Sequence, residues 1–211
     1  LGLTYIIIGL FLNYVTDDEK VVKIKDLLLY AFLCVILVTM KLPYVLLVGL
    51  LLFIPKKKTQ CKNYYLISLA LIISVFVFTI FWYVLTQQVR IENFKLEGAD
   101  VKGQISSIIS KPHWYLPVIL KEMLLSVSHL NQLYTFGWLD LSMSEVLIPI
   151  YALYTLITFS NIGKIKLPKV SVVGASLVSF AIVGLISLTL YLTWTPVGNF
   201  EVLGVQGRYY L

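Results

Sequence analysis

Long apolar runs separated by short polar stretches dominate the chain. Residues 64–87 and 171–193 are the clearest runs, and each exceeds the roughly 20 residues that an α-helix needs to cross a bilayer. The pattern therefore predicts a bundle of membrane-spanning helices. About six hydrophobic segments follow from it, at residues 1–15, 27–40, 43–54, 64–87, 145–160 and 171–193.

Residues 27–54 form one apolar stretch that is interrupted only at Lys41-Leu42-Pro43. A single straight helix of this length would extend about 42 Å, against a hydrocarbon core of about 30 Å. Pro43 also disfavours helical geometry at Leu42. We therefore expect two short helices that fold back as a hairpin with Lys41 at the bend. One long tilted span is the alternative.

The distribution of lysines orients these segments. Residues 55–62 contain four lysines and residues 161–170 contain three, and neither loop contains an acid. Loops rich in Lys and Arg remain on the cytoplasmic side of a membrane. We therefore expect a multi-pass protein of the cell membrane with both loops in the cytoplasm. The loop 88–144 and residues 194–211 would then lie outside.

The composition agrees with an all-α membrane protein. The chain is 59% hydrophobic and 13% charged, with a net charge of +6. We attribute this charge to topology and to contact with membrane lipid, so no nucleic acid partner is expected. The chain begins with Leu1, has no signal peptide pattern and ends as apolar sequence resumes. We expect residues 1–211 to be a single transmembrane domain, truncated at both ends.

The outer loop contains an amphipathic pattern over residues 110–133. We expect a helix there that lies in the outer interface, with Ser110 as its N-cap and Pro112 in its first turn. Lys121 and Glu122 lie away from its apolar face. That face carries Leu116, Leu120, Met123, Val127 and Leu130.

The last residues of the chain combine glycines with an arginine. Gly204 and Gly207 flank Gln206, and Arg208 and Tyr209 follow. The planar guanidinium of Arg208 can pair with a phosphate through two hydrogen bonds. The same residues also fit an interfacial anchor, in which the arginine extends to the head groups and the tyrosines form an aromatic belt. Both interpretations remain open from the chemistry alone.

Three short motifs occur in this order along the chain: Lys41-Leu-Pro-Tyr44, Phe136-Gly-Trp-Leu-Asp140 and Gly204-Val-Gln-Gly-Arg-Tyr209. Together they resemble those of domain-of-unknown-function family 2142, a family of predicted bacterial membrane proteins, and the likeness covers essentially the whole chain. The family is similar in architecture to GT-C glycosyltransferases, which use polyprenyl-phosphate sugar donors at the outer face. The resemblance also implies an acidic motif upstream of Leu1, so the catalytic residue is unknown here and the 211-residue chain is expected to be inactive alone.

The resemblance implies a transferase that moves a sugar from a polyprenyl-phosphate donor to a cell-envelope glycan. Lys41 and Arg208 would bind the phosphate of the carrier, while Trp138 and Tyr209 would shape the sugar cleft. Substrate binding would thus involve Lys41, Tyr44, Trp138, Asp140, Gln206, Arg208 and Tyr209. Two alternatives are a transporter or flippase of lipid-linked saccharides, which would use the same basic residues without chemistry, and a non-catalytic membrane protein.

Other chemistries find little support in the sequence. His113 and His129 stand sixteen residues apart without a companion acid or cysteine cluster, so no metal site is expected. A nucleotide-binding glycine motif and a serine nucleophile elbow are both missing, and no cofactor is expected. Cys34 and Cys61 lie in unrelated surroundings and form no disulfide framework.

Overall fold

The computed structural model of the chain describes residues 2–86, 98–125, 135–136, 141–142, 149–150, 153, 156–157, 167–206 and 209. Their contacts divide the chain into two compact units. The first unit comprises Leu1–Lys95 and Lys166–Leu185, and the second comprises Leu96–Ile165 and Ile186–Leu211. Helix α7 (Lys169–Thr193) begins in the first unit and ends in the second.

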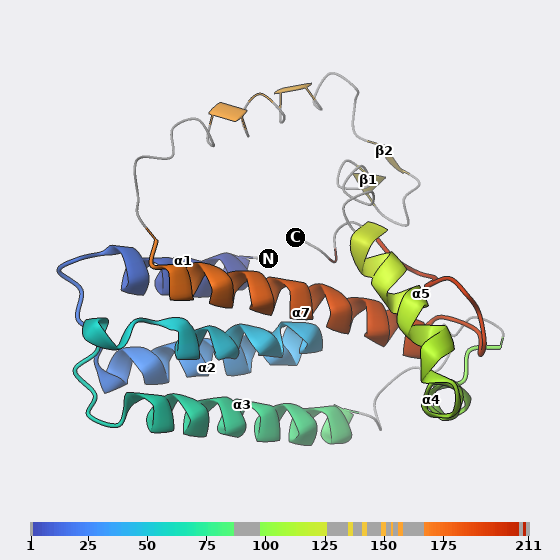
Figure 1. Cartoon of the computed structure of the whole chain (residues 1–211), viewed down its shortest axis with the longest axis horizontal. Coiled ribbons are helices and arrows are strands. Elements are labelled where there is room, and N and C mark those ends of the chain that lie inside the picture. The colour runs from blue at the N-terminus through green and yellow to red at the C-terminus, as the bar shows by residue number, and fades with distance from the viewer. Residues whose placement is uncertain are drawn as a thin grey trace. The chain divides into compact units, whose positions relative to one another are not determined.

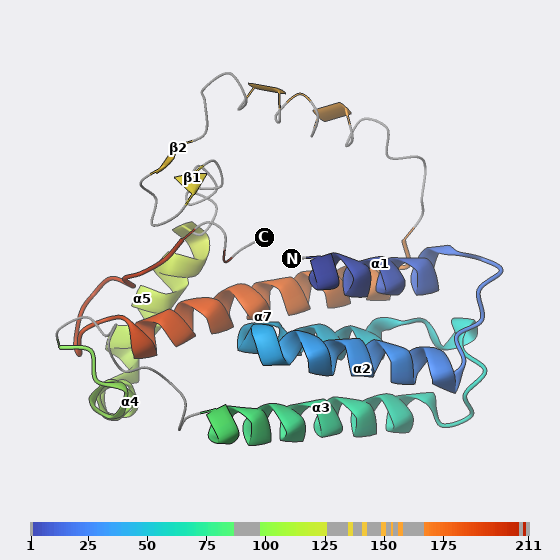
Figure 2. The same ribbon diagram turned by 180° about the vertical axis from the view of Figure 1, so that it is seen from behind.

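The first unit is a group of helices with roughly aligned axes (Figures 1 and 2). Helices α1 (Gly2–Thr16) and α2 (Ile24–Met40) are followed by two 3-10 helices, η1 (Leu42–Phe53) and η2 (Lys56–Lys58). Helix α3 (Tyr64–Thr86) and the first part of α7 complete the unit. Among the residues described, α3 and α7 are the two helices long and apolar enough to cross a membrane.

The predicted hairpin is confirmed. Helix α2 ends at Met40, and the backbone of Lys41 is extended, with φ −145° and ψ 95°. Helix η1 then runs back beside α2, with the hydroxyl of Tyr30 donating a hydrogen bond of 3.2 Å to the carbonyl of Leu47 (Figure 1). Pro43 explains the position of the bend, because it disfavours the helical conformation of Leu42.

The second arm of the hairpin is a 3-10 helix of 12 residues. At about 2.0 Å per residue it extends roughly 24 Å, close to the roughly 25 Å of the 17-residue α2 at 1.5 Å per residue. Residues three apart eclipse one another in a 3-10 helix, and burial in η1 follows that period. Two of its three rows are buried; they contain Tyr44, Leu47 and Leu50, and Val45, Val48 and Leu51.

Three buried tyrosines connect the helices of the first unit. The hydroxyl of Tyr14 donates to the carbonyl of Asp26 at 3.3 Å, and that of Tyr64 donates to the carbonyl of Leu51. Tyr30 makes the third such bond, to Leu47. Each phenol therefore fills the core with its ring and satisfies its polar end at a backbone carbonyl of a neighbouring segment.

The polar linkers meet at one end of this unit. The Nζ of Lys58 donates to the carbonyl of Asp17 at 2.8 Å and forms an ion pair of 2.9 Å with Oδ1 of Asp18. Val22 and Thr59 form an isolated parallel bridge beside it. The polar linker after α1 and the lysine loop after η1 consequently lie on the same side of the unit, as the hairpin requires.

The second unit contains α4 (Val101–Ser110), α5 (Pro112–Leu125), the end of α7 and the strands β1 (Thr135–Phe136) and β2 (Leu141–Ser142). The strands pair antiparallel, with Thr135 opposite Ser142 and Phe136 opposite Leu141. Apart from this short pairing, the regular structure of the described residues is helical.

The helix predicted over residues 110–133 is wrong at its start. Ser110 ends α4, and its Oγ donates to the carbonyl of Ser106 at 2.7 Å rather than capping the next helix. The N-cap of α4 is instead Asp100, whose carboxylate accepts from the backbone N–H groups of Lys102 and Gly103. Pro112 does begin α5, as predicted, and residues 126–133 lie outside the described residues.

Candidate functional site

Lys41 and Tyr44 are brought together at the bend of the hairpin. The Nζ of Lys41 lies 5.3 Å from the centroid of the Tyr44 ring, which is the geometry of a cation–π contact. Tyr44 is 6% exposed, while Lys41 is partly exposed. The motif Lys41-Leu-Pro-Tyr44 thus places an ammonium group over a buried aromatic ring.

The segment after α7, residues 194–206, turns at the positions that its glycines predict. Gly198 and Gly204 have φ angles of +84° and +77°, in the region that favours glycine. A Cβ on Gly204 would meet the ring of Trp194 at 3.3 Å. The group that Gly204 approaches closely is therefore an indole of the same segment.

Gln206 and Tyr209 are joined by a turn, in which the backbone N–H of Tyr209 donates to the carbonyl of Gln206 at 2.9 Å. The side-chain Oε1 of Gln206 is buried and accepts no hydrogen bond from the residues that the structure describes. Trp138, Asp140 and Arg208, the other residues expected at the site, lie outside the described residues. Lys41 and Tyr44 belong to the first unit, and Gln206 and Tyr209 belong to the second.

The segment after α7 is tied to α4 by Gln104, which is fully buried. Its Nε2 donates to the carbonyl of Tyr191 at 3.3 Å, and its Oε1 accepts from the backbone N–H of Gly198 at 3.1 Å. Thr195 adds a second tie, because its Oγ1 accepts from the N–H of Leu203 at 3.0 Å. These bonds fix the backbone that carries Phe200 and Glu201.

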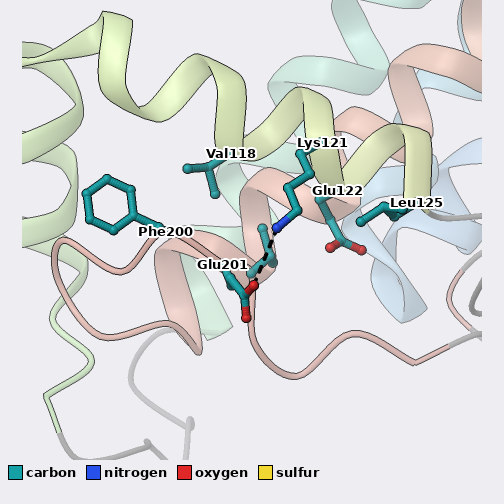
Figure 3. A pocket seen from close by; sticks show the side chains of 7 residues that line it. Val118, Lys121, Glu122, Leu125, Phe200 and Glu201 are labelled. Carbon is teal, nitrogen blue, oxygen red and sulfur yellow. Dashed lines mark hydrogen bonds and ion pairs between the residues drawn. The ribbon is translucent and has the colours of Figure 1, made fainter.

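A cavity of about 210 Å³, here called the polar cavity, lies between α5 and this segment. Figure 3 shows side chains of α5 directed toward the segment, with the Lys121–Glu201 ion pair between Phe200 and Glu122. The cavity is lined by Val118, Lys121, Glu122, Leu125, Phe200, Glu201 and Val202.

The polar cavity combines charged and aromatic groups. The Nζ of Lys121 lies 3.4 Å from Oε1 of Glu201, and these side chains are 58% and 69% exposed. Exposed pairs of this kind contribute roughly 0–1 kcal/mol, so the pair can open at little cost. Phe200 extends the cavity into an aromatic surface, because its ring centroid lies 5.8 Å from that of Trp114.

A second cavity of about 380 Å³, here called the apolar cavity, also touches α5. Apart from His113 and Tyr115, the side chains around it carry no polar groups. Its volume falls within the range of roughly 300–1,000 Å³ that is usual for small-molecule sites. It is lined by Ile108, Pro112, His113, Tyr115, Leu116, Ile119 and Leu188.

Sequence reasoning missed the polar cavity. It placed Lys121 and Glu122 together on the face of the helix away from the apolar residues and assigned no role to them, whereas the structure exposes Lys121 and buries Glu122 beside Val118. The sequence did contain a signal for a polar site on this helix, because apart from His113 the charged residues of α5 are Lys121 and Glu122. Phe200 and Glu201 gave no signal, because only the fold of the segment after α7 brings them to α5.

No group of three His, Cys, Asp or Glu side chains that could hold a metal ion occurs within the described part of the chain. No curated protein and no solved structure matches the chain significantly. The model of one family, described as Predicted membrane protein (DUF2142), matches residues 2–211. This match covers nearly the whole chain, as the three sequence motifs led us to expect. The chain therefore belongs to the DUF2142 family of predicted membrane proteins.

Proposed function

We propose that this chain forms part of a membrane glycosyltransferase, similar in architecture to the GT-C enzymes, that takes a sugar from a polyprenyl-phosphate donor. The acceptor is a cell-envelope glycan, and the reaction takes place at the outer face of the membrane. In this proposal the chain contributes six hydrophobic segments to a polytopic bundle. The loops 55–62 and 161–170 face the cytoplasm, and the loop 88–144 and residues 194–211 face outward.

One observation carries the proposal: α5 lines two cavities of opposite chemistry. Leu116 and Ile119 contribute to the apolar cavity, while Val118 and Glu122 contribute to the polar cavity. A lipid-linked sugar is itself divided into an apolar chain and a hydroxylated ring. The prenyl chain matches the first cavity and the ring matches the second.

The phosphate between chain and ring requires cations. Lys41 and Arg208 are the groups that we assign to it, with Trp138, Tyr209 and the remaining motif residues shaping the sugar cleft. A planar guanidinium pairs with two phosphate oxygens, whereas an ammonium supplies a point charge. Both cations stabilise negative charge on the departing carrier phosphate.

The proposal is tested with Arg208→Lys in the native protein. Loss of one charge-assisted hydrogen bond costs roughly 1.5–3 kcal/mol, so we expect sugar transfer from polyprenyl-phosphate donors to fall about ten- to a hundredfold. Arg90→Lys is the matched control, because Arg90 is the other arginine of the chain. It should transfer sugar at the wild-type rate, and both variants should be present in membranes at normal abundance.

Two other outcomes decide against parts of the proposal. If Arg208→Lys transfers sugar at the wild-type rate, Arg208 does not make the two-point phosphate contact and is an interfacial anchor. If the wild-type protein transfers sugar from none of the donors but moves lipid-linked saccharides across vesicle membranes, the protein is a flippase.

A further inference from the structure

We propose that the polar cavity binds one uncharged pyranose ring, with Glu122 accepting hydrogen bonds from its hydroxyls and Phe200 packing against its face. This inference rests on the proposed function and names the part of the substrate that this cavity holds. It concerns residues that the sequence motifs do not include.

The position of Glu122 is the first argument. Glu122 lies one helical turn after Val118 on the inward face of α5, and the two residues are 8% and 6% exposed. Glu122 also lines the polar cavity, and a carboxylate there can accept hydrogen bonds from the hydroxyl groups of a ligand.

The charges of the cavity select the ligand. Two carboxylates, Glu122 and Glu201, and one ammonium, Lys121, line it, so its formal charge is negative. Like charges repel, and a phosphate is therefore disfavoured in the cavity. An uncharged polyol is not repelled, and its hydroxyls can donate to the carboxylates and accept from Lys121.

The aromatic surface supplies the other half of a saccharide site. Phe200 and Trp114 are 58% and 51% exposed, and their rings are in contact. Exposed aromatic rings beside a polar cavity offer the apolar face that the C–H side of a pyranose requires. The volume of about 210 Å³ is smaller than drug-sized sites of roughly 300–1,000 Å³, so it suits one ring rather than an oligosaccharide.

The Lys121–Glu201 pair gives the cavity a way to adapt. Its two side chains are exposed and their interaction is weak, so each can exchange its partner for a sugar hydroxyl. Phe200 precedes Glu201 directly, and the Gln104 and Thr195 contacts hold this segment in place. Phe200 and Glu201 therefore contact the pyranose ring from a backbone that is held in place.

The test is saturation-transfer NMR on the purified native protein in nanodiscs, with methyl glycosides of glucose, galactose, mannose and N-acetylglucosamine as probes. Glucose 6-phosphate serves as the charged counterpart of glucose. We expect at least one uncharged glycoside to bind at millimolar concentration and the phosphorylated sugar to bind more weakly. Glu122→Gln should weaken glycoside binding about tenfold or more, because it replaces a charged acceptor with a neutral amide.

Phe200→Leu is a second variant, because the exposed ring of Phe200 can be removed without opening the core. It should weaken binding about two- to tenfold. The matched controls are Glu19→Gln and Phe81→Leu, which change an exposed carboxylate and an exposed ring of the first unit. Both controls should bind as the wild type does.

Three results would overturn the inference. They are no binding of any uncharged glycoside, equal or tighter binding of the phosphorylated sugar, or wild-type affinity for glycosides in both single variants, Phe200→Leu and Glu122→Gln. The fate of the proposed function is read separately in the transfer assay. If glycoside binding depends on Glu122 but no sugar is transferred, the saccharide site is supported and the glycosyltransferase proposal is wrong. If sugar transfer depends on Arg208 but not on Glu122 or Phe200, the glycosyltransferase proposal is supported and the saccharide site is wrong.

Discussion

The Oγ of Ser171 donates a hydrogen bond of 2.7 Å to the backbone carbonyl of Phe53, and one turn later Gly174 leaves the space that the side chain of Phe53 fills. A Cβ built on Gly174 would overlap Cγ of Phe53. The start of α7 is therefore held against the end of η1 by one polar contact and one steric fit.

We expect Gly174→Ala to destabilise the first unit, because overpacking costs about 1–3 kcal/mol. The measurement is the midpoint of thermal unfolding in detergent. Gly9→Ala is the control, since a Cβ there meets no atom within 4 Å, and it should leave the midpoint unchanged or slightly raised. Equal midpoints for the two variants would show that α7 does not need this fit.

The ion pair of Lys58 and Asp18 predicts a pH dependence. The hydrogen bond from Lys58 holds the pKa of the Asp18 carboxyl below its usual value. The contact therefore stabilises the fold above the usual pKa of about 3.9 and loses its effect as the pH falls through the lowered pKa. Asp18→Asn should melt below the wild type at neutral pH, and the difference should vanish in acid.

Glu19→Gln is the control for this titration. Glu19 is exposed and forms no ion pair with the described residues. Its midpoint should follow that of the wild type at every pH. A difference between wild type and Asp18→Asn that persisted at acid pH would mean that the carboxylate charge is not the source of the stabilisation.

Thiol labelling in intact cells tests the topology. Cys61 is partly exposed and Cys34 is fully buried, so labelling reports on Cys61. It should react with a membrane-permeant maleimide and resist an impermeant one. In a Cys61→Ser background, Glu19→Cys should behave as Cys61 does, because the Val22–Thr59 bridge places both on one side. Labelling of Cys61 from outside would reverse the orientation.

Gln104 offers a test of the second unit. Gln104→Leu leaves the N–H of Gly198 and the carbonyl of Tyr191 without their partner, and a buried unsatisfied polar group costs about 1–3 kcal/mol. We expect faster hydrogen exchange over residues 194–206. Ser106→Ala, which removes an exposed hydroxyl of the same helix, should exchange as the wild type. Unchanged exchange in Gln104→Leu would show that other contacts hold this segment.

The parts of the fold that the sequence predicts are those governed by local chemistry. The bend at Lys41 follows from Pro43, and the turns after α7 follow from Gly198 and Gly204. Small residues in the apolar run 171–193 also favour close packing against a neighbouring helix, and Gly174 packs closely against Phe53.

The parts that sequence reasoning could not reach depend on tertiary contacts. An apolar run such as residues 42–53 is compatible with an α-helix or a 3-10 helix, because nearly every residue in it is apolar and either period would bury apolar side chains. Tyr64 begins the apolar run 64–87, a position where tyrosines commonly mark a membrane interface, yet it is a core residue bonded to the carbonyl of Leu51. Glu122 became a site candidate only when the fold placed Phe200 and Glu201 beside it.

The period of η1 determines which insertions and deletions the first unit can accept. Removal of one residue from a 3-10 helix turns every later side chain by about 120°, so the partly exposed row of Leu46, Gly49 and Leu52 would replace a buried one. Removal of three residues would keep the rows aligned but shorten the segment by about 6 Å. Homologous chains should therefore differ in length at the ends of η1 and not within it.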